Sequence, residues 1–456
     1  MRNVLFAFGL IMVILTSCSK KDIQTPAPLL TVKSSVLKSG YDRVPNEILI
    51  KFRDGVDETK KTTVLGKIDG RRKERIMTRA MVKDGDKQGL ALISMPGAVD
   101  DAIAKINALP DVEYAEPNYI YTNQAVSNDP YYSYQWGMYG PRTNPANPNG
   151  SQAAVAWAAG HTGSASVYVG IIDAGYMYYH EDLIGNAGTN PGELEGDAID
   201  NDGNGYIDDV NGWDFYANDN TLFDGMEDLH GTLVAGIIGA AGGNGTGVAG
   251  VCWNVKMLNA KFVGPLGGTL ANAIKAIDYF TNLKLKGVNI VATNNSWSGG
   301  GYSQGLKDAI ERANRANILF IATAGNNGMN TEFTPSYPSG YPNTNIIAVA
   351  STNYLGALST FSNYAESKVD LCAPGELIAS CIPVLTSGGQ YISHYAYASG
   401  TSMAAPFVTG AAALYASRHH DAKAEEIKNA ILDATTEVHA LEGKCKTQGR
   451  LNLSGF

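Results

Sequence analysis

Strand-like and helix-like segments alternate through the C-terminal two-thirds of this chain, and the alternation restricts the folds that it can adopt. Apolar runs typical of buried strands lie at residues 167–172, 290–296, 318–324 and 346–350. Helical spacing of apolar or small residues covers 230–241, 270–285, 304–316, 401–418 and 424–434. Strands that are separated by helices pair in parallel, and the helices cover both faces of the sheet. We therefore expect an α/β fold with a mostly parallel central sheet.

A second, smaller domain is expected upstream, because 456 residues are too many for one ordinary domain. Residues 47–52 and 89–94 alternate like strands, 98–109 have the spacing of a helix, and 112–119 close the unit. The sequence thus predicts a small α+β domain over residues 44–123 and the larger α/β domain over residues 124–456.

Residues 1–18 are typical of a targeting segment. Arg2 precedes an apolar stretch over 4–15, which is too short to span a bilayer comfortably, and the segment ends Leu15-Thr16-Ser17-Cys18. This ending resembles the bacterial lipobox, whose cysteine is lipidated and becomes the mature N-terminus; a plain signal peptide is the alternative. Residues 19–43 are polar and fit a tether. We expect an exported protein that is anchored through Cys18 in the cell envelope, or secreted after processing.

The larger domain is acidic. From Asn123 onward it has 16 Lys and Arg against 29 Asp and Glu, a balance of −13. Fifteen of these acids lie between Asp173 and Asp228, where there is no Lys or Arg. Such a surface would repel phosphates, so nucleic acid is excluded as a partner, whereas bound cations would suit it. A solvated acidic loop is the simpler alternative.

Four polar residues stand where a parallel sheet places functional groups. Asp173 and Asn326 follow strand-like runs, His230 opens a helix rich in small residues, and Ser402 begins another after Gly400. Each alone is ambiguous, as a turn residue, a structural histidine or a helix cap. Together they supply an orienting carboxylate, a base, a nucleophile and an oxyanion donor, which a serine hydroxyl needs before it can attack a carbonyl.

In their order along the chain, these motifs resemble those of the subtilisin-like serine peptidases, over about residues 129–453. The resemblance implies a three-layer α/β/α fold, with Asp173 as orienter, His230 as general base, Ser402 as nucleophile and Asn326 in the oxyanion hole. It implies a serine endopeptidase that forms an acyl-enzyme, acts on proteins or peptides as a monomer, and uses no organic cofactor. The absence of a Gly-x-Ser-x-Gly motif disfavours an α/β-hydrolase esterase.

The same resemblance implies that a segment after the run at 290–296 pairs with extended substrate. The substrate-binding residues expected from it are Ser296, Trp297, Ser298, Gly299 and Gly325. Two residues depart from the family pattern. Leu233 replaces a common histidine. Trp297 replaces a smaller apolar residue beside the substrate pockets, so the family's usual specificity rules are not carried over to this chain.

Residues 44–123 resemble the inhibitory pro-domain of this family. The resemblance implies an intramolecular inhibitor and a cleavage zone at residues 122–128. Cleavage there would separate the peptidase from its tether unless the pieces stay associated.

Two calcium sites are expected. Residues 200–209 carry oxygen ligands at alternate positions and a glycine at the turn, as an EF-hand loop does, but Asn211 stands where the closing Glu would be. The candidate ligands are Asp200, Asp202, Asn204, Asp208 and Asp209, and an acidic turn is the alternative. The family resemblance adds Asp182 and Asn244 as a second site.

Several questions stay open at the level of the sequence. Export permits disulfides, and Cys252, Cys372, Cys381 and Cys445 allow three pairings, of which a local bridge between Cys372 and Cys381 is one possibility. Two other functions compete with a general endopeptidase: a non-catalytic binding protein on a peptidase fold, and a processing protease with one protein target. Substrate preference and the membrane face are not determined.

Overall fold

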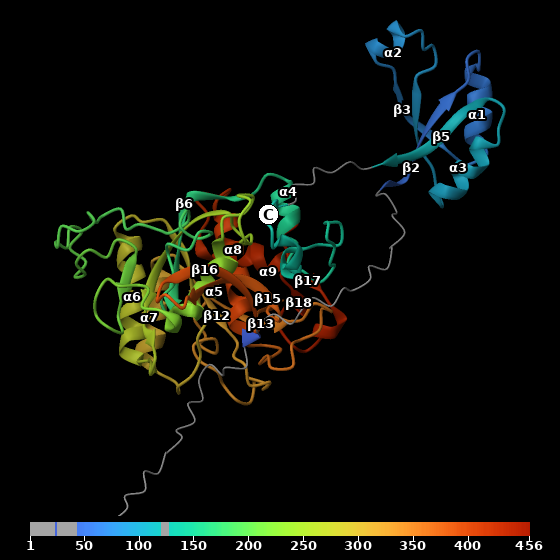
Figure 1. Cartoon of the computed structure of the whole chain (residues 1–456). Coiled ribbons are helices and arrows are strands. Elements are labelled where there is room, and N and C mark those ends of the chain that lie inside the picture. Colours follow the sequence, from blue (N-terminus) through green and yellow to red (C-terminus); the bar gives the residue numbers. More distant parts are fainter. Residues whose placement is uncertain (1–22, 25–42, 120–126) are drawn as a thin grey trace, which may run out of the picture. The chain divides into compact units, whose positions relative to one another are not determined.

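The computed structural model describes residues 23–24, 43–119 and 127–456, which form two compact units (Figure 1). Residues 43–119 form the smaller unit, and residues 127–456 with 23–24 form the larger one. Three features expected from the sequence lie outside the described residues: Cys18 with its targeting segment, most of the tether, and residues 122–126 of the cleavage zone.

The smaller unit is a four-stranded antiparallel sheet in the order β3-β4-β2-β5. Its strands are β2 (Arg43–Phe52), β3 (Arg71–Ile76), β4 (Leu90–Ser94) and β5 (Val112–Tyr119), and its helices are α1 (Glu58–Gly66), α2 (Arg79–Lys83) and α3 (Val99–Asn107). Ile48, Ile50 and Ile93 from the sheet are fully buried with Ile106 from α3. These alternating side chains give the α+β unit a core of its own.

The larger unit is built on a nine-stranded sheet in the order β17-β18-β14-β13-β12-β11-β6-β8-β7. All neighbours pair in parallel except β17 and β18. The strands are β6 (Gly163–Asp173), β7 (Gly212–Asp214), β8 (Asn254–Lys261), β11 (Ile290–Asn295), β12 (Leu319–Thr323), β13 (Ile346–Thr352), β14 (Leu371–Pro374), β17 (Thr436–Glu437) and β18 (Gly449–Arg450). The expected α/β fold is confirmed.

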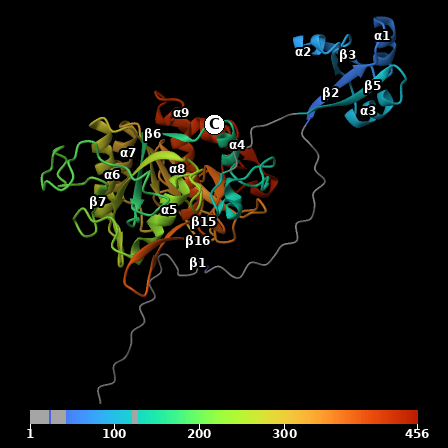
Figure 2. The same cartoon turned by 45° about the horizontal axis from the view of Figure 1, so that its top comes forward.

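Helices cover both faces of this sheet. On one face, Val169 and Ile171 of β6 share a core with α4 (Ala153–Ala158), α5 (Leu229–Gly239), α8 (Thr401–Ala416) and α9 (Ala424–Asp433). On the other, Ile172 packs with α6 (Leu270–Leu285) and α7 (Gln304–Arg315), which lie side by side in both views (Figures 1 and 2). The alternation of side chains along one strand therefore supplies both cores.

Shorter elements complete the larger unit. The hairpin of β15 (Ile378–Leu385) and β16 (Tyr391–Ala398) packs against α5, and β1 (Ile23–Gln24) pairs antiparallel with β16. The remaining elements are β9 (Val263–Gly264), β10 (Gly267–Gly268) and the 3-10 turns Tyr132–Tyr134, Trp136–Met138, Met226–Asp228 and His439–Leu441. Within the described residues, no helix combines the length and apolarity needed to cross a membrane.

The four cysteines of the larger unit are buried and form no disulfide. Cys372 lies on β14, and its sulfur is 3.6 Å from that of Cys445. Cys381 lies on β15, where the hairpin packs against α5. A local bridge between Cys372 and Cys381, one of the pairings left open by the sequence, is therefore not the arrangement found, because the chain turns from the sheet into the hairpin between them.

Candidate active site

Asp173 is the last residue of β6, at the carboxyl edge of the parallel sheet. Its side chain is buried and its Oδ1 accepts a hydrogen bond from the Ala174 N–H at 2.7 Å. The same oxygen lies 2.6 Å from His230 Nδ1. An imidazole that donates its Nδ1 proton to a carboxylate has its Nε2 left as the basic nitrogen, so this contact fixes the tautomer that a general base requires.

His230 reaches Asp173 because α5 starts very close to the strand ends. His230 is the second residue of this helix. A Cβ atom at Gly231 would lie 2.3 Å from the Gly175 carbonyl oxygen and 2.6 Å from that of Ala174. Only glycine permits that approach. The small residues noted in the sequence thus bring the imidazole over the end of β6.

Ser402 is the second residue of α8 and exchanges hydrogen bonds with Ser296, which follows β11. Ser402 Oγ donates to the Ser296 carbonyl at 3.1 Å, and Ser296 Oγ donates to the Ser402 carbonyl at 2.8 Å. Pro406 explains the second bond. Proline has no N–H, so the carbonyl four residues earlier lacks its helical partner, and the Ser296 hydroxyl takes that place.

Asn326 lies three residues after β12 and is exposed. Its Oδ1 accepts hydrogen bonds from the Thr401 N–H and the Thr401 hydroxyl, both at 2.8 Å. A backbone N–H can only donate, so the atom facing it must be the amide oxygen. The Asn326 amide nitrogen is therefore directed away from Thr401, as a donor beside the start of α8.

The segment expected to bind substrate follows β11. Ser298 and Gly299 are exposed, and the Gly299 N–H donates to the Tyr337 carbonyl at 3.1 Å. Trp297 is half-buried, with its ring 5.0 Å from that of Phe262 and 6.5 Å from that of Phe320. These two aromatic contacts with core side chains hold the Trp297 indole in place.

Gly325, the remaining residue of the expected substrate-binding set, has a left-handed backbone with φ of +103°. Its N–H donates to the Thr401 hydroxyl at 3.2 Å. Its backbone therefore holds the turn that presents Asn326.

Residues 164–455, more than half of the chain, match the model of the Subtilase family, Peptidase S8. The chain belongs to the subtilase family. Residues 31–118 match the Fervidolysin N-terminal prodomain, so this subtilase carries a pro-domain. It is a serine-type endopeptidase made as a zymogen, as the sequence predicts.

One of its relatives matches nearly the whole chain. The chain is 31% identical over 440 residues to "Thermophilic serine proteinase" of Bacillus sp. (strain AK1), covering 96% of this chain and 92% of the relative. It is 33% identical over 326 residues to "Thermitase" of Thermoactinomyces vulgaris, covering 71% and 96%. A solved protease structure from Pseudoalteromonas arctica has a TM-score of 0.56 and 27% identity, covering 72% of this chain and 97% of that one.

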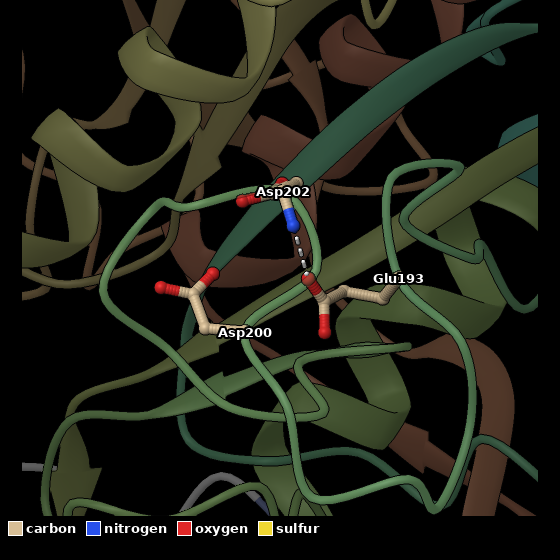
Figure 3. A group of neighbouring side chains, drawn as sticks. All are labelled: Glu193, Asp200 and Asp202. Atoms are coloured by element: carbon tan, nitrogen blue, oxygen red, sulfur yellow. Dashed lines mark hydrogen bonds between the residues drawn. The ribbon is translucent and has the colours of Figure 1, made fainter.

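The acidic loop of this subtilase gathers three carboxylates. One carboxylate oxygen from each of Glu193, Asp200 and Asp202 lies within 4.8 Å of the others. Figure 3 shows the three side chains on the loop, with Glu193 facing the backbone nitrogen of Asp202. The Asp202 N–H donates to Glu193 at 3.0 Å, and Lys286 Nζ lies 3.2 Å from Asp202 Oδ1. The spacing within residues 200–211 did not reveal Glu193, because it comes from an earlier turn.

The other candidate ligands of this loop are used differently. Asp208 accepts hydrogen bonds from the N–H groups of residues 196 and 198 and so caps a separate turn. Asp209 is fully buried and accepts from Tyr279 at 2.7 Å and from the Asn204 amide at 3.0 Å. Burial raises the pKa of Asp209. Asn204 also contacts the carboxylate group itself, because its amide donates to Asp202 at 3.2 Å and its N–H donates to Asp200 at 2.9 Å.

The second expected calcium site has its oxygens already engaged. Asp182 is fully buried, and it accepts from the Asn244 amide at 2.9 Å and from the Val248 N–H at 2.8 Å. The Asn244 oxygen accepts from the Thr246 N–H at 2.7 Å. Burial raises the pKa of Asp182 to about 7. The two residues are neighbours, as expected, and their role as calcium ligands stays a prediction.

Proposed function

We propose that this subtilase hydrolyses peptide bonds with Asp173, His230, Ser402 and Asn326. The observation that carries the proposal is the 2.6 Å contact between Asp173 Oδ1 and His230 Nδ1. Ser402 Oγ attacks the substrate carbonyl while His230 Nε2 takes its proton, and the Asn326 amide donates to the oxyanion. His230 then returns the proton to the leaving amine. Water next attacks the acyl-enzyme while His230 takes its proton, and His230 finally returns that proton to Ser402.

The test compares Ser402→Ala with Ser417→Ala, which removes a hydroxyl at the C-terminal end of the same helix. Casein or peptide hydrolysis should disappear in the first variant and persist in the second. Activity that survives Ser402→Ala would refute the assignment. An oxyanion asparagine in a subtilisin is worth about 10²–10³ in kcat. We expect Asn326→Ala to lose that order of kcat with KM little changed.

We propose that Ser296, Trp297, Ser298 and Gly299 form one wall of the substrate cleft, supported by the exposure of Ser298 and Gly299. Backbone pairing of substrate along such a segment tolerates many sequences. Cleavage of a peptide library by the mature enzyme separates a general endopeptidase from a processing enzyme, since the latter would cut few members.

We infer that the chain is exported and that Cys18 is lipidated. The chain is 32% identical over 322 residues to "Extracellular basic protease" of Dichelobacter nodosus, of which it covers 50%. Mass spectrometry of the mature N-terminus tests the inference. A diacylglyceryl mass at Cys18 that is absent in Cys18→Ser supports it, whereas an unmodified N-terminus after cleavage would favour a plain signal peptide. The same spectra would show whether a cut within 122–128 separates residues 44–123 from residues 124–456.

We propose that the carboxylates of Glu193, Asp200 and Asp202 bind calcium. Calcium prefers several oxygen ligands, and three carboxylates supply more negative charge than the single nearby Lys286 offsets. A bound ion would stabilise the folded state by mass action. EDTA should lower the Tm of the Ser402→Ala protein, and Asp200→Asn should remove that response. Glu195→Gln, an exposed acid of the same loop, is the control and should leave it unchanged.

A further inference from the structure

A buried lysine lies beside the candidate catalytic residues. Lys261 ends β8 and is the register partner of Asp173 on β6. It is 1% exposed. Its Nζ lies 3.1 Å from Asp228 and 3.4 Å from Asp214, and it also contacts Asp224. All three carboxylates belong to the segment 214–228, which connects β7 to the helix of His230. The ammonium group of Lys261 thus holds this segment against the sheet through three carboxylates.

Asp228 connects this cation to the site. It immediately precedes α5, two residues before His230. Its carboxylate accepts from the Gly175 N–H at 2.8 Å and from the Asp224 N–H at 2.6 Å. Gly175 in turn lies two residues after Asp173. The Asp228 side chain therefore joins the loop that carries the orienting carboxylate to the start of the helix that carries the base.

A second pair of hydrogen bonds joins the loop after Asp173 to the start of α5. The Thr232 hydroxyl donates to the Asp228 carbonyl at 2.8 Å and accepts from the Met177 N–H at 3.0 Å. A Cβ at Gly175 would lie 2.7 Å from the Asp228 carboxylate, so the loop and the helix start are in close contact. A shift of Asp228 would therefore move the Asp173 loop and His230 relative to each other.

We infer that Lys261 is a positioning residue for catalysis, which holds Asp228 and thereby sets the hydrogen bond between Asp173 and His230. The inference rests on the proposed function. Apolar side chains of similar volume often replace a buried ion pair without loss of stability, so stability alone does not account for the charge network. A positioning role does account for the charge network, because an error of about 1 Å in a catalytic group can cost roughly 10² in rate.

The test uses Lys261→Met, with Lys256→Met as the matched control. Lys256 lies on the same strand, is half-buried and donates to the Gly185 carbonyl. Two readouts apply: kcat and KM of the mature enzyme, and the downfield proton NMR signal of the His230 Nδ1–H in the Ser402→Ala protein. We expect Lys261→Met to lose about 10–100-fold in kcat with KM within about twofold, and to shift or broaden the signal. Lys256→Met should change neither.

Normal kcat and an unchanged signal in folded Lys261→Met would overturn the inference. If that variant does not fold, Asp224→Asn decides by the same readouts, because it removes one partner of Lys261 at a partly exposed position. A wild-type enzyme without Ser402-dependent hydrolysis would instead refute the proposed function, and the NMR signal would still test the positioning.

Discussion

At the scale of residues, the exchange of hydrogen bonds between Ser296 and Ser402 links the proposed substrate-binding segment to the proposed nucleophile. The Ser296 hydroxyl satisfies the carbonyl that Pro406 leaves without a helical partner. The two hydrogen bonds also couple the backbone at Ser296 to the start of α8.

Replacing Ser296 with alanine tests this link. The Ser402 carbonyl would be buried without a partner, which costs about 1–3 kcal/mol in the free energy of unfolding. Chemical denaturation in the Ser402→Ala background measures the cost, and kcat in the active enzyme should fall as well. Ser298→Ala, on the exposed part of the same segment, should leave the unfolding free energy unchanged.

At the scale of elements, the approach of α5 to the ends of the strands determines the geometry of the site. Gly231→Ala should shift the helix start, since the new Cβ would lie 2.3 Å from a backbone oxygen that cannot yield. We expect kcat to fall at least tenfold and the Tm to drop by several degrees. Gly185→Ala, where a Cβ would meet nothing within 4 Å, is the control. Similar kcat values for the two variants would contradict this account.

The pro-domain sheet contains an acid-sensitive contact. Asp86 accepts from Lys51 and from the N–H groups of Gly89 and Gln88, which lower the pKa of its carboxyl to about 2. The ionised form is therefore favoured in the folded state, and its contribution is complete above about pH 4 and lost as the pH falls toward 2. The protection factors of amide hydrogens in residues 43–119 should fall over this range more in the wild type than in Asp86→Asn. Asp84→Asn should behave like the wild type.

The sequence predicted elements best where local signals agreed. The predicted helix at 270–285 matches α6, because Thr269 caps its first turn and apolar residues recur along one side. The strand at Asn254–Lys261 was missed, because its asparagines and lysines make a buried strand look polar in the sequence. Glu193 was also missed, and the pairing of Cys372 with Cys445 stayed open, because each depends on segments that meet through tertiary folding.

At the scale of the whole molecule, two cysteines far apart in the sequence lie side by side: Cys372 on β14 and Cys445 in the turn before β18. Refolding with a small disulfide as oxidant should cross-link Cys372 to Cys445, because their sulfurs lie 3.6 Å apart in the folded protein. The Cys445 thiolate would attack the oxidant and release one of its two thiols. The Cys372 thiolate would then attack the resulting mixed disulfide and release the second thiol. Non-reducing peptide mapping identifies the pair. A linkage through Cys252 or Cys381 would contradict the expectation.

The acid-rich stretch between Asp173 and Asp228 obtains its buried counter-charge from later in the chain. Lys261, which is 1% exposed, neutralises Asp214 and Asp228. Synthesis delivers the chain from its N-terminus, so these two carboxylates emerge before the lysine that compensates for their burial. They must stay hydrated until residue 261 is available. The order of charges along the chain thus delays closure of this part of the proposed active site until β8 has been made.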